Sequence, residues 1–287
     1  MSKPILKIKN LNVEYPLFGG ILQREVSCVH AVKNLSIEIP EGQTVGIVGE
    51  SGSGKSTLGK AILNVLNLTA PDVRINGEVL LHDDGNYIDI MSLSKKELIK
   101  YRPQMQMIFQ DPFSSLNPRM IVKDIIREPL DIHTSLSKDE KDEKVRWLLK
   151  KVGLSVEQEM RYPHEFSGGQ RQRIGIARAL ATEPKIIIAD EPVSALDVSI
   201  QAQVINLMMD LQKEFNLTIL FIAHDLSVVK HISSKIGVMY LGNLVESGDS
   251  ETIFKEPQHD YTKKLLKAIP IPDPKNREER KKERLEK

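Results

Sequence analysis

The chain has 287 residues, of which 40% are hydrophobic, so it can bury the core of one large or two small domains. Its 40 lysines and arginines nearly balance its 39 aspartates and glutamates, which argues against the basic surface of a nucleic-acid-binding protein. The single cysteine, Cys28, excludes an intramolecular disulfide and a cluster of thiolate metal ligands.

The first part of the chain predicts a small antiparallel sheet. Over residues 5–15, apolar and polar side chains alternate, as they do in a half-buried strand. A second alternating run at residues 35–39 ends at Pro40 and Gly42, which are turn residues. The intervening residues 16–30 contain Gly19-Gly20, and we interpret them as a long, loose connection.

From residue 43 onward, short apolar strands alternate with helical spacing, which is typical of a parallel α/β sheet. Strands are expected at residues 44–48, 105–109, 186–189, 219–222 and 236–240. Helices are expected at residues 55–66, 121–133, 138–152, 171–181, 200–215 and 226–231, and a capping box at Ser94 and Glu97 predicts a further short one.

These patterns predict an α/β fold with a parallel-sheet core, an N-terminal antiparallel subdomain and a helical insert at about residues 111–181. One main domain would cover residues 1–270. Residues 271–287 form a highly charged tail, which we interpret as a solvated helix or a disordered end. Charges interrupt the N-terminal apolar residues, and no run of about 18 apolar residues occurs, so we expect neither a signal peptide nor a membrane-spanning helix.

A complete phosphate-loop motif follows the strand expected at residues 44–48. Backbone N–H groups of such a loop surround phosphate oxygens, and the helix that follows adds its positive N-terminal end. The lysine provides a charge for the β- and γ-phosphates, and the serine hydroxyl is a magnesium ligand. The motif predicts a nucleotide and Mg²⁺ as ligands and consists of Gly49, Glu50, Ser51, Gly52, Ser53, Gly54, Lys55 and Ser56, with Thr57 next to it.

A second motif is the apolar strand at residues 186–189, which ends in Asp190 and Glu191. Asp190 can hold magnesium, directly or through water, and Glu191 can activate a water molecule for attack on the γ-phosphate. Such a pair alone would more often be a surface turn. Its occurrence beside a phosphate loop favours the catalytic interpretation.

A third motif is Ser167-Gly168-Gly169-Gln170, at the start of the helix expected at 171–181. Ser167 can cap that helix, and the glycines let backbone N–H groups approach an anion. A capped helix start would explain the segment by itself. With the other two motifs, it indicates a second phosphate-recognising helix terminus.

With these motifs, the chain resembles the nucleotide-binding subunits of ATP-binding-cassette (ABC) transporters over residues 6–270. The resemblance implies that Tyr15 stacks on adenine, that Gln110 senses magnesium and the attacking water, and that His224 contacts the γ-phosphate. It also implies a dimer in which Ser167–Gln170 of one chain completes the ATP site of the other, with residues 194–197 at the contact. Phe166 stands where the family usually has leucine, and we expect that change to affect packing only.

Residues 109–120 and 258–266 are similar to the ATPases of oligopeptide and dipeptide importers, especially their F-type subunit. That resemblance implies ATP-driven import by two ATPases, two membrane permeases and an extracytoplasmic solute-binding protein. The chain would then lie at the cytoplasmic face of the membrane, paired with a paralogous ATPase or, in isolation, with itself. Residues 111–120 are our candidate for the permease contact, and nucleic acid is not an expected partner.

Other functions remain open at this point. Similar ATPases serve importers of nickel or sugars. A soluble ATPase of the same architecture could act on DNA or ribosomes, although the balanced charge argues against this. A regulatory module that binds ATP without hydrolysing it would not need Glu191, His224 and Gln110 together.

Overall fold

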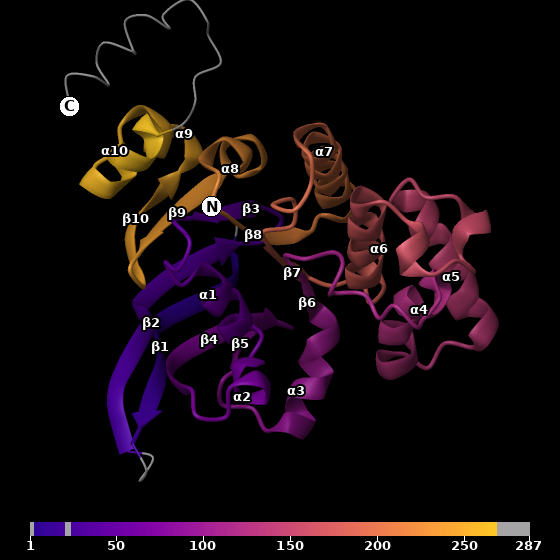
Figure 1. Cartoon of the computed structure of the whole chain (residues 1–287). Helices are drawn as coiled ribbons and strands as arrows, with labels where there is room; N and C mark the ends of the chain where they lie inside the picture. The colour runs from indigo at the N-terminus through magenta and orange to yellow at the C-terminus, as the bar shows by residue number, and fades with distance from the viewer. Residues whose placement is uncertain (1–2, 21–23, 269–287) are drawn as a thin grey trace, which may run out of the picture.

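The computed structural model describes residues 3–20 and 24–268. Within this part of the chain, two sheets lie side by side, and a group of helices projects from the larger sheet (Figure 1). The charged tail predicted at residues 271–287 lies outside the described residues.

The larger sheet has the strand order β10-β9-β3-β8-β7-β6, and β9 to β6 in this order run parallel, whereas β10 is an antiparallel edge strand. Strands β3, β7 and β8 are buried along their whole length, as expected for a parallel sheet that is covered on both faces. The strands are β3 (Thr44–Val48), β6 (Met105–Ile108), β7 (Ile186–Asp190), β8 (Thr218–Ala223), β9 (Lys235–Tyr240) and β10 (Asn243–Asp249).

The smaller sheet is antiparallel, with the order β2-β1-β4-β5. Its strands are β1 (Pro4–Gly19), β2 (Arg24–Pro40), β4 (Arg74–Asp83) and β5 (Asn86–Asp89). Helix α1 (Lys55–Ile62) lies between the sheets, and its Leu58, Ala61 and Ile62 belong to the apolar cluster that joins them. The sequence patterns indicated β1 and β2 but missed β4 and β5.

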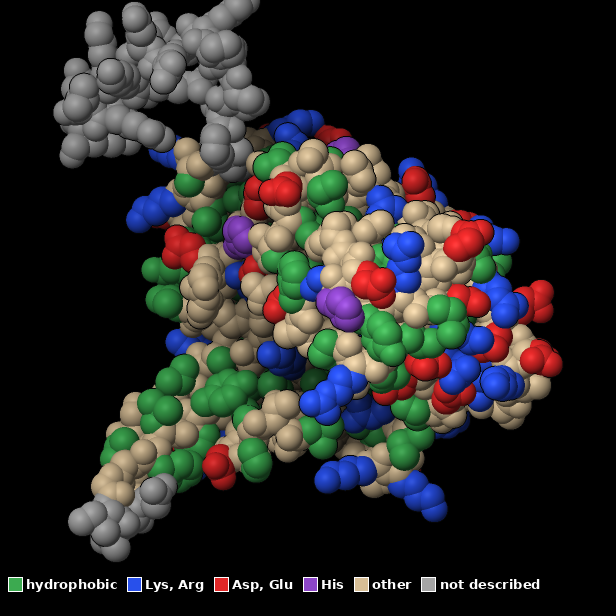
Figure 2. Space-filling model, turned by 45° about the vertical axis from the view of Figure 1, so that its right-hand side comes forward, with side chains coloured by type: hydrophobic (Ala, Val, Ile, Leu, Met, Phe, Trp, Pro, Cys, Tyr) green, Lys and Arg blue, Asp and Glu red, His purple; other side chains and the backbone are tan. Residues whose placement is uncertain are grey.

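The prediction of a loose connection over residues 16–30 is wrong. Strands β1 and β2 stay paired beyond Tyr15, with Tyr15 opposite Val29 and Leu17 opposite Ser27, and Gly19-Gly20 stands where β1 ends. Pro16 is accommodated because β4 pairs with β1 only as far as Glu14, so the outer hairpin is a two-stranded ribbon with free edges. Figure 2 shows this arm with hydrophobic side chains gathered on it; Leu17, Phe18, Val26 and Val29 are exposed.

The helix expected at residues 55–66 is also shorter than predicted. Asn64 adopts φ of 50°, which interrupts the helix after α1, and the short helix α2 (Leu66–Thr69) follows. The helix that the capping box at Ser94 and Glu97 predicts is present as α3 (Lys95–Tyr101), followed by the 3₁₀ turn Arg102–Gln104.

Between β6 and β7, the chain forms three helices that project from the larger sheet (Figure 1). Their apolar faces share one buried cluster with the adjoining face of that sheet. These helices are α4 (Val122–His133), α5 (Lys138–Lys151) and α6 (Gly168–Leu180), with 3₁₀ turns at Val156–Gln158 and Pro163–Glu165. The predicted fold, a parallel core with an antiparallel subdomain and a helical insert, is confirmed.

Four further helices complete the described chain. Helix α7 (Val198–Phe215) joins β7 to β8 and ends at Asn216, whose φ of 48° is the left-handed conformation common after a helix. Helix α8 (Leu226–Ile232) joins β8 to β9. After β10 come α9 (Ser250–Lys255) and α10 (Asp260–Lys267), which lie beside β9 and β10 (Figure 1).

Candidate ATP-hydrolysis site

The phosphate-loop motif lies between β3 and α1, at the carboxyl end of the parallel sheet. Gly54 immediately precedes α1 and has φ of 102°, and a Cβ atom there would come within 2.0 Å of the Ala31 carbonyl oxygen on β2. Only glycine satisfies both conditions. At Gly52, no atom outside the neighbouring residues lies within 4 Å of such a Cβ position, so this part of the loop faces open space. Glu50 and Ser51 line a cavity described below, and Thr57 lies in the first turn of α1.

Lys55 is folded into the loop to which it belongs. Its Nζ donates hydrogen bonds to the carbonyl oxygens of Gly49 (2.7 Å) and Glu50 (2.9 Å), and lies 3.5 Å from Ser53 Oγ. Burial lowers the pKa of Lys55, and the carboxylates of Glu191 and Asp190 act in the opposite direction. An incoming phosphate would therefore meet a lysine that is already desolvated and held near the loop.

Asp190 lies at the end of β7 and accepts a hydrogen bond from the Ser56 hydroxyl, with 2.8 Å between Oγ and Oδ1. Sheet order explains this contact, because only β8 separates β7 from the strand that leads into the loop. Burial raises the pKa of Asp190, whereas the hydrogen bond from Ser56 opposes that rise. The contact brings a hydroxyl and a carboxylate together beside the phosphate loop.

Glu191 lies where the carboxyl ends of β6, β7 and β8 come together. Its Oε2 accepts a hydrogen bond from Gln110 Nε2 (3.0 Å), which follows β6, and lies 3.2 Å from Nδ1 of His224, which follows β8. Glu191 has φ of 45°, and its N–H donates to the Ile222 carbonyl oxygen (2.9 Å). A left-handed conformation is uncommon for glutamate and is often found at functional sites.

A cavity of about 680 Å³ opens at this convergence. Its lining includes the three side chains just described, two phosphate-loop residues and residues of the loop after β7. The lining residues are Glu50, Ser51, Gln110, Asp111, Glu191, Ser194, Ala195, His224 and Leu265. The arrangement can hold a water molecule against a carboxylate at one end of a phosphate-binding loop.

The Ser167–Gln170 motif lies at the start of α6. Ser167 Oγ accepts the N–H of Gln170 (3.3 Å), and Gln170 Oε1 accepts the N–H of Ser167 (3.0 Å), which together form a capping box. Among the described residues, no hydrogen bond joins this motif to the phosphate loop of the same chain. The helix start is fixed locally and is not closed over by its own nucleotide site.

The glycines of this motif pack on the segment that follows Glu191. A Cβ atom at Gly168 would lie 3.3 Å from the Leu196 side chain, and one at Gly169 would lie 2.4 Å from that of Ile200. Ser194 Oγ donates to the Glu191 carbonyl oxygen (3.1 Å), so the loop at residues 194–197 links Glu191 to the helix start. Phe166 is buried in the apolar cluster of the helical insert.

Tyr15 lies on β1 opposite Val29 and packs, half-buried, against the apolar cluster that includes Leu58 of α1. The structure therefore places it on the N-terminal sheet, against the apolar cluster to which α1 also contributes. Whether it stacks on adenine stays a prediction.

Two arginines of α6 hold the segment after Gln110. The guanidinium of Arg171 lies 4.2 Å from the ring centroid of Phe113, which is 55% exposed. Arg178 donates to the Ser115 carbonyl oxygen (2.7 Å), and burial lowers the pKa of its guanidinium. Beside them, a cavity of about 280 Å³ separates β6 from α4 and has Phe109 and Ile132 in its lining.

Sequence reasoning missed two residues of the site, both on α10. The Tyr261 hydroxyl accepts the N–H of Glu50 (3.0 Å), and Leu265 lines the cavity around Glu191. In the sequence, residues 258–266 are notable only for their resemblance to importer ATPases. No local pattern indicates that a helix so far along the chain reaches the phosphate loop.

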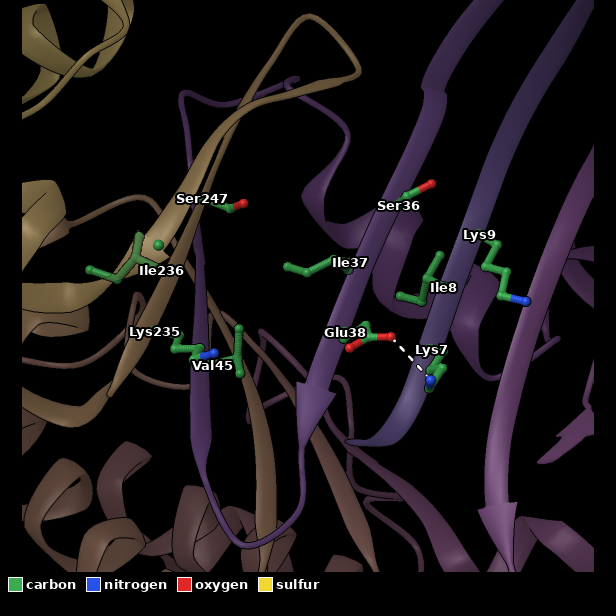
Figure 3. Close-up of a pocket in the computed structure, with 11 residues that line it drawn as sticks. Lys7, Ile8, Lys9, Ser36, Ile37, Glu38, Val45, Lys235, Ile236 and Ser247 are labelled. Carbon is green, nitrogen blue, oxygen red and sulfur yellow. Dashed lines mark ion pairs between the residues drawn. The ribbon is translucent and has the colours of Figure 1, made fainter. Parts of the chain in front are cut away.

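A further cavity, of about 500 Å³, lies between the two sheets and carries no comparable chemistry. Figure 3 shows its lining, with β1 and β2 on one side and β3, β9 and β10 on the other. Lys7 and Glu38 form an ion pair there (3.2 Å), but this pair and the other lining residues lie apart from the motifs of the site. Among the described residues, no helix is both long and apolar enough to cross a bilayer.

Comparison with known proteins places these features in a family. Residues 32–194 match the family model of the ABC transporter, and residues 245–287 match that of the oligopeptide/dipeptide transporter, C-terminal region. The oligopeptide transport ATP-binding protein OppF of Bacillus subtilis is 54% identical over 96% of this chain and 85% of its own length.

Another relative, the glutathione import ATP-binding protein GsiA of Pectobacterium atrosepticum, is 48% identical over 96% of this chain, which spans 43% of that longer protein. The dimeric post-hydrolysis structure of the ATP-binding cassette MJ0796 with ADP and Pi matches with a TM-score of 0.70 and 30% identity, over 85% of this chain and 98% of that one. CbiO1 of Clostridium perfringens matches with a TM-score of 0.72 and 27% identity, over the full length of both chains. The chain therefore belongs to the ABC transporter family, as an ATP-binding subunit with the C-terminal region of its oligopeptide/dipeptide transporter group.

Proposed function

We propose that this chain is the ATPase that drives uptake of oligopeptides or dipeptides through membrane permeases. The observation that carries the proposal is the convergence of Gln110 and His224 on one oxygen of Glu191, beside the phosphate loop. The peptide substrate is supported by the identity with OppF and by the match of residues 245–287. We also propose residues 1–270 as the nucleotide-binding domain, residues 111–181 as its helical subdomain and residues 271–287 as a separate tail.

In the reaction we propose, Lys55 and the loop N–H groups hold the β- and γ-phosphates. Glu191 accepts a proton from the attacking water, whose oxygen bonds to the γ-phosphorus as the bond to the β–γ bridging oxygen breaks. ADP and inorganic phosphate are the products. Gln110 and His224 would hold the Glu191 carboxylate in place, and we propose that His224 also contacts the γ-phosphate.

The residues near Ser56 fit Mg²⁺. Adjacent ligands of an octahedral magnesium ion, each at 2.0–2.1 Å, lie about 2.9 Å apart. The oxygens of Ser56 and Asp190 are 2.8 Å apart and offer the hydroxyl and carboxylate groups that this ion prefers. We propose these two as its protein ligands, with the side-chain oxygen of Gln110 as a third. Bound there, magnesium would neutralise charge on the β- and γ-phosphates.

A second chain would complete the site. The Ser167–Gln170 helix start is capped by its own residues, and no described hydrogen bond connects it to the phosphate loop of its own chain. We propose that it closes over the nucleotide of a paralogous ATPase, or of a second copy when the chain is isolated. Residues 194–197 would lie at the contact, because Leu196 already packs on Gly168.

The permease contact that we propose is the segment at residues 111–120. Exposed Phe113 offers an apolar anchor, and Arg171 and Arg178 fix the segment to α6. The neighbouring cavity between β6 and α4 can receive an apolar side chain from a partner. The subunit would lie at the cytoplasmic face of the membrane, with the permeases passing on a solute delivered by the extracytoplasmic binding protein.

Two measurements test the proposal. Purified chain should release phosphate from ATP in the presence of Mg²⁺, which a regulatory module without hydrolysis would not do. Deletion of the gene should abolish uptake of labelled oligopeptides or dipeptides and leave nickel and sugar uptake intact. Loss of nickel or sugar uptake instead would identify an importer of another solute, and co-purification with ribosomes or DNA would indicate a non-transport ATPase.

A further inference from the structure

Three segments that lie far apart in the sequence contact the phosphate loop. The Ala31 carbonyl on β2 packs against Gly54. The N–H of Gly242, in the turn between β9 and β10, donates to the Ser53 carbonyl oxygen (3.1 Å). The third contact comes from α10, where the Tyr261 hydroxyl accepts the N–H of Glu50, 211 residues away in sequence.

The Tyr261 contact acts on the same peptide group that holds Lys55. The carbonyl of Gly49 and the N–H of Glu50 belong to one planar peptide unit, in which they point in opposite directions. The carbonyl accepts a hydrogen bond from Lys55 Nζ (2.7 Å), and the N–H donates to the Tyr261 hydroxyl (3.0 Å). The peptide is therefore fixed at both edges, and each hydrogen bond polarises the group that makes the other.

Tyr261 is itself held firmly. Its side chain is 8% exposed, and its ring centroid lies 4.1 Å from that of Tyr240. Its N–H donates to His259 Nδ1 (3.1 Å), and the carboxylate of Glu246 on β10 accepts the N–H groups of Gln258 (2.8 Å) and His259 (3.0 Å). The first turn of α10 is thus tied to the edge of the sheet, and this fixes the position of the hydroxyl.

The same face of α10 also reaches the catalytic cavity. Leu265 follows Tyr261 by four residues, so both side chains project from one side of the helix. Leu265 lines the cavity that contains Glu191, whereas Tyr261 contacts the loop. One short helix therefore contacts the phosphate loop and also lines the cavity where hydrolysis is proposed.

We propose that Tyr261 is a positioning residue for ATP: it fixes the Gly49–Glu50 peptide and, through it, the ammonium group of Lys55. The C-terminal region thereby becomes a working part of the ATP site, although the matched ABC transporter region ends at residue 194. The inference rests on ATP binding at the phosphate loop and goes beyond it. Without the hydroxyl, the Glu50 N–H has no acceptor, the peptide can rotate, and Lys55 loses the Gly49 carbonyl.

The test compares Tyr261→Phe with Tyr240→Phe in the full chain. The first variant keeps the ring against Tyr240 and removes only the acceptor, and the second removes the hydroxyl of Tyr240 itself. The readouts are the Kd for ATP, the thermal midpoint and the amide hydrogen exchange of Glu50 without nucleotide. We expect Tyr261→Phe to weaken ATP binding about three- to tenfold and to accelerate Glu50 exchange, with a small fall in thermal midpoint from the lost hydrogen bond. Tyr240→Phe should bind ATP as the wild type does.

Several results would overturn the inference. Wild-type ATP affinity in Tyr261→Phe would show that the hydrogen bond positions nothing. An equal loss of ATP affinity in Tyr240→Phe, or unchanged Glu50 exchange in Tyr261→Phe, would assign the effect to packing of α10. These outcomes differ from a failure of the proposed function itself, in which the wild-type chain would bind no ATP and Tyr261 would have no ligand to position.

Discussion

The two helix starts of this chain that are suited to phosphate differ in how they are supported. The start of α1 is surrounded: β2, the β9–β10 turn and α10 contact its loop, and Asp190 contacts Ser56. The start of α6 is held by its own capping box and by packing on Leu196 and Ile200. In our proposal, the first site lacks only a closing surface from a second chain, and the α6 start supplies such a surface.

Because of this difference, we expect ATP binding and ATP turnover to depend on different residues. A residue at the surrounded loop should affect ATP binding by a single chain, whereas a residue at the α6 start should matter only when two chains meet. Glu191 lies between these regions, because the loop that follows it packs on α6. Variants in the three places should therefore give different combinations of affinity, turnover and stability.

The largest effect is expected for Glu191→Gln. Removing the general base should lower ATP turnover about 10²- to 10⁴-fold, while ATP binding is preserved and an ATP-dependent dimer accumulates. Phosphate release and size-exclusion chromatography with ATP check this. Glu183→Gln is a matched control, since Glu183 is also a left-handed glutamate but pairs with Lys144 away from the cavity. Unchanged hydrolysis in Glu191→Gln would refute its role.

Next in size is Lys55→Ala, which tests the surrounded loop directly. Loss of a charge-assisted contact to phosphate should weaken ATP binding by the isolated chain about 10- to 100-fold. Titration with ATP measures this, and Lys96→Ala on the exposed surface of α3 should bind normally. An unaltered affinity in Lys55→Ala would contradict the phosphate-loop assignment.

Ser167→Ala examines the other helix start. We expect about tenfold slower hydrolysis with unchanged ATP affinity of the monomer, because the serine would act on the nucleotide of the other chain. Ser137→Ala is the control, as Ser137 caps α5 through the same kind of capping box. Each variant should lose about 1 kcal/mol of stability, but only Ser167→Ala should slow turnover. A binding defect in monomeric Ser167→Ala would mean that the serine acts within its own chain.

The smallest expected effect is a change in thermal midpoint, because the buried charge of Asp190 destabilises the folded state. Burial raises the pKa of Asp190, so the folded state favours its protonated form and is penalised above that pKa. Asp190→Asn should therefore raise the thermal midpoint at pH 7 by about 2 °C. The gain should disappear as the pH falls through the raised pKa, when the native carboxyl becomes protonated.

Asp83 provides the opposite case when the thermal midpoint is measured over the same range of pH. The hydrogen bond from Lys185 lowers the pKa of Asp83, so its stabilising contribution is present at neutral pH and is lost as the pH falls through that lowered pKa. Asp83→Asn should reduce the thermal midpoint at pH 7 and approach the wild type in acid. If both variants shifted the midpoint in the same direction, burial would not be the cause at Asp190.

The sequence by itself determined the elements whose information is local. The phosphate loop requires glycines at fixed spacing, the capping box of Ser94 and Glu97 is readable from residues three apart, and buried parallel strands are continuous apolar runs. The parallel core, the antiparallel subdomain and the helical insert could therefore be anticipated. Asp190 and Glu191 gained meaning because they follow such a strand.

Only the tertiary structure decided which residues meet. The pairing of residues 16–19 with β2 depends on the partner strand, since glycine and proline suggest a loop when they are considered alone. The convergence of Gln110 and His224 on Glu191 follows from strand order β8-β7-β6, which no local pattern encodes. Tyr261 reaches Glu50 across 211 residues, because folding brings the edge of the sheet and its last described helix back to the loop near the start of the chain.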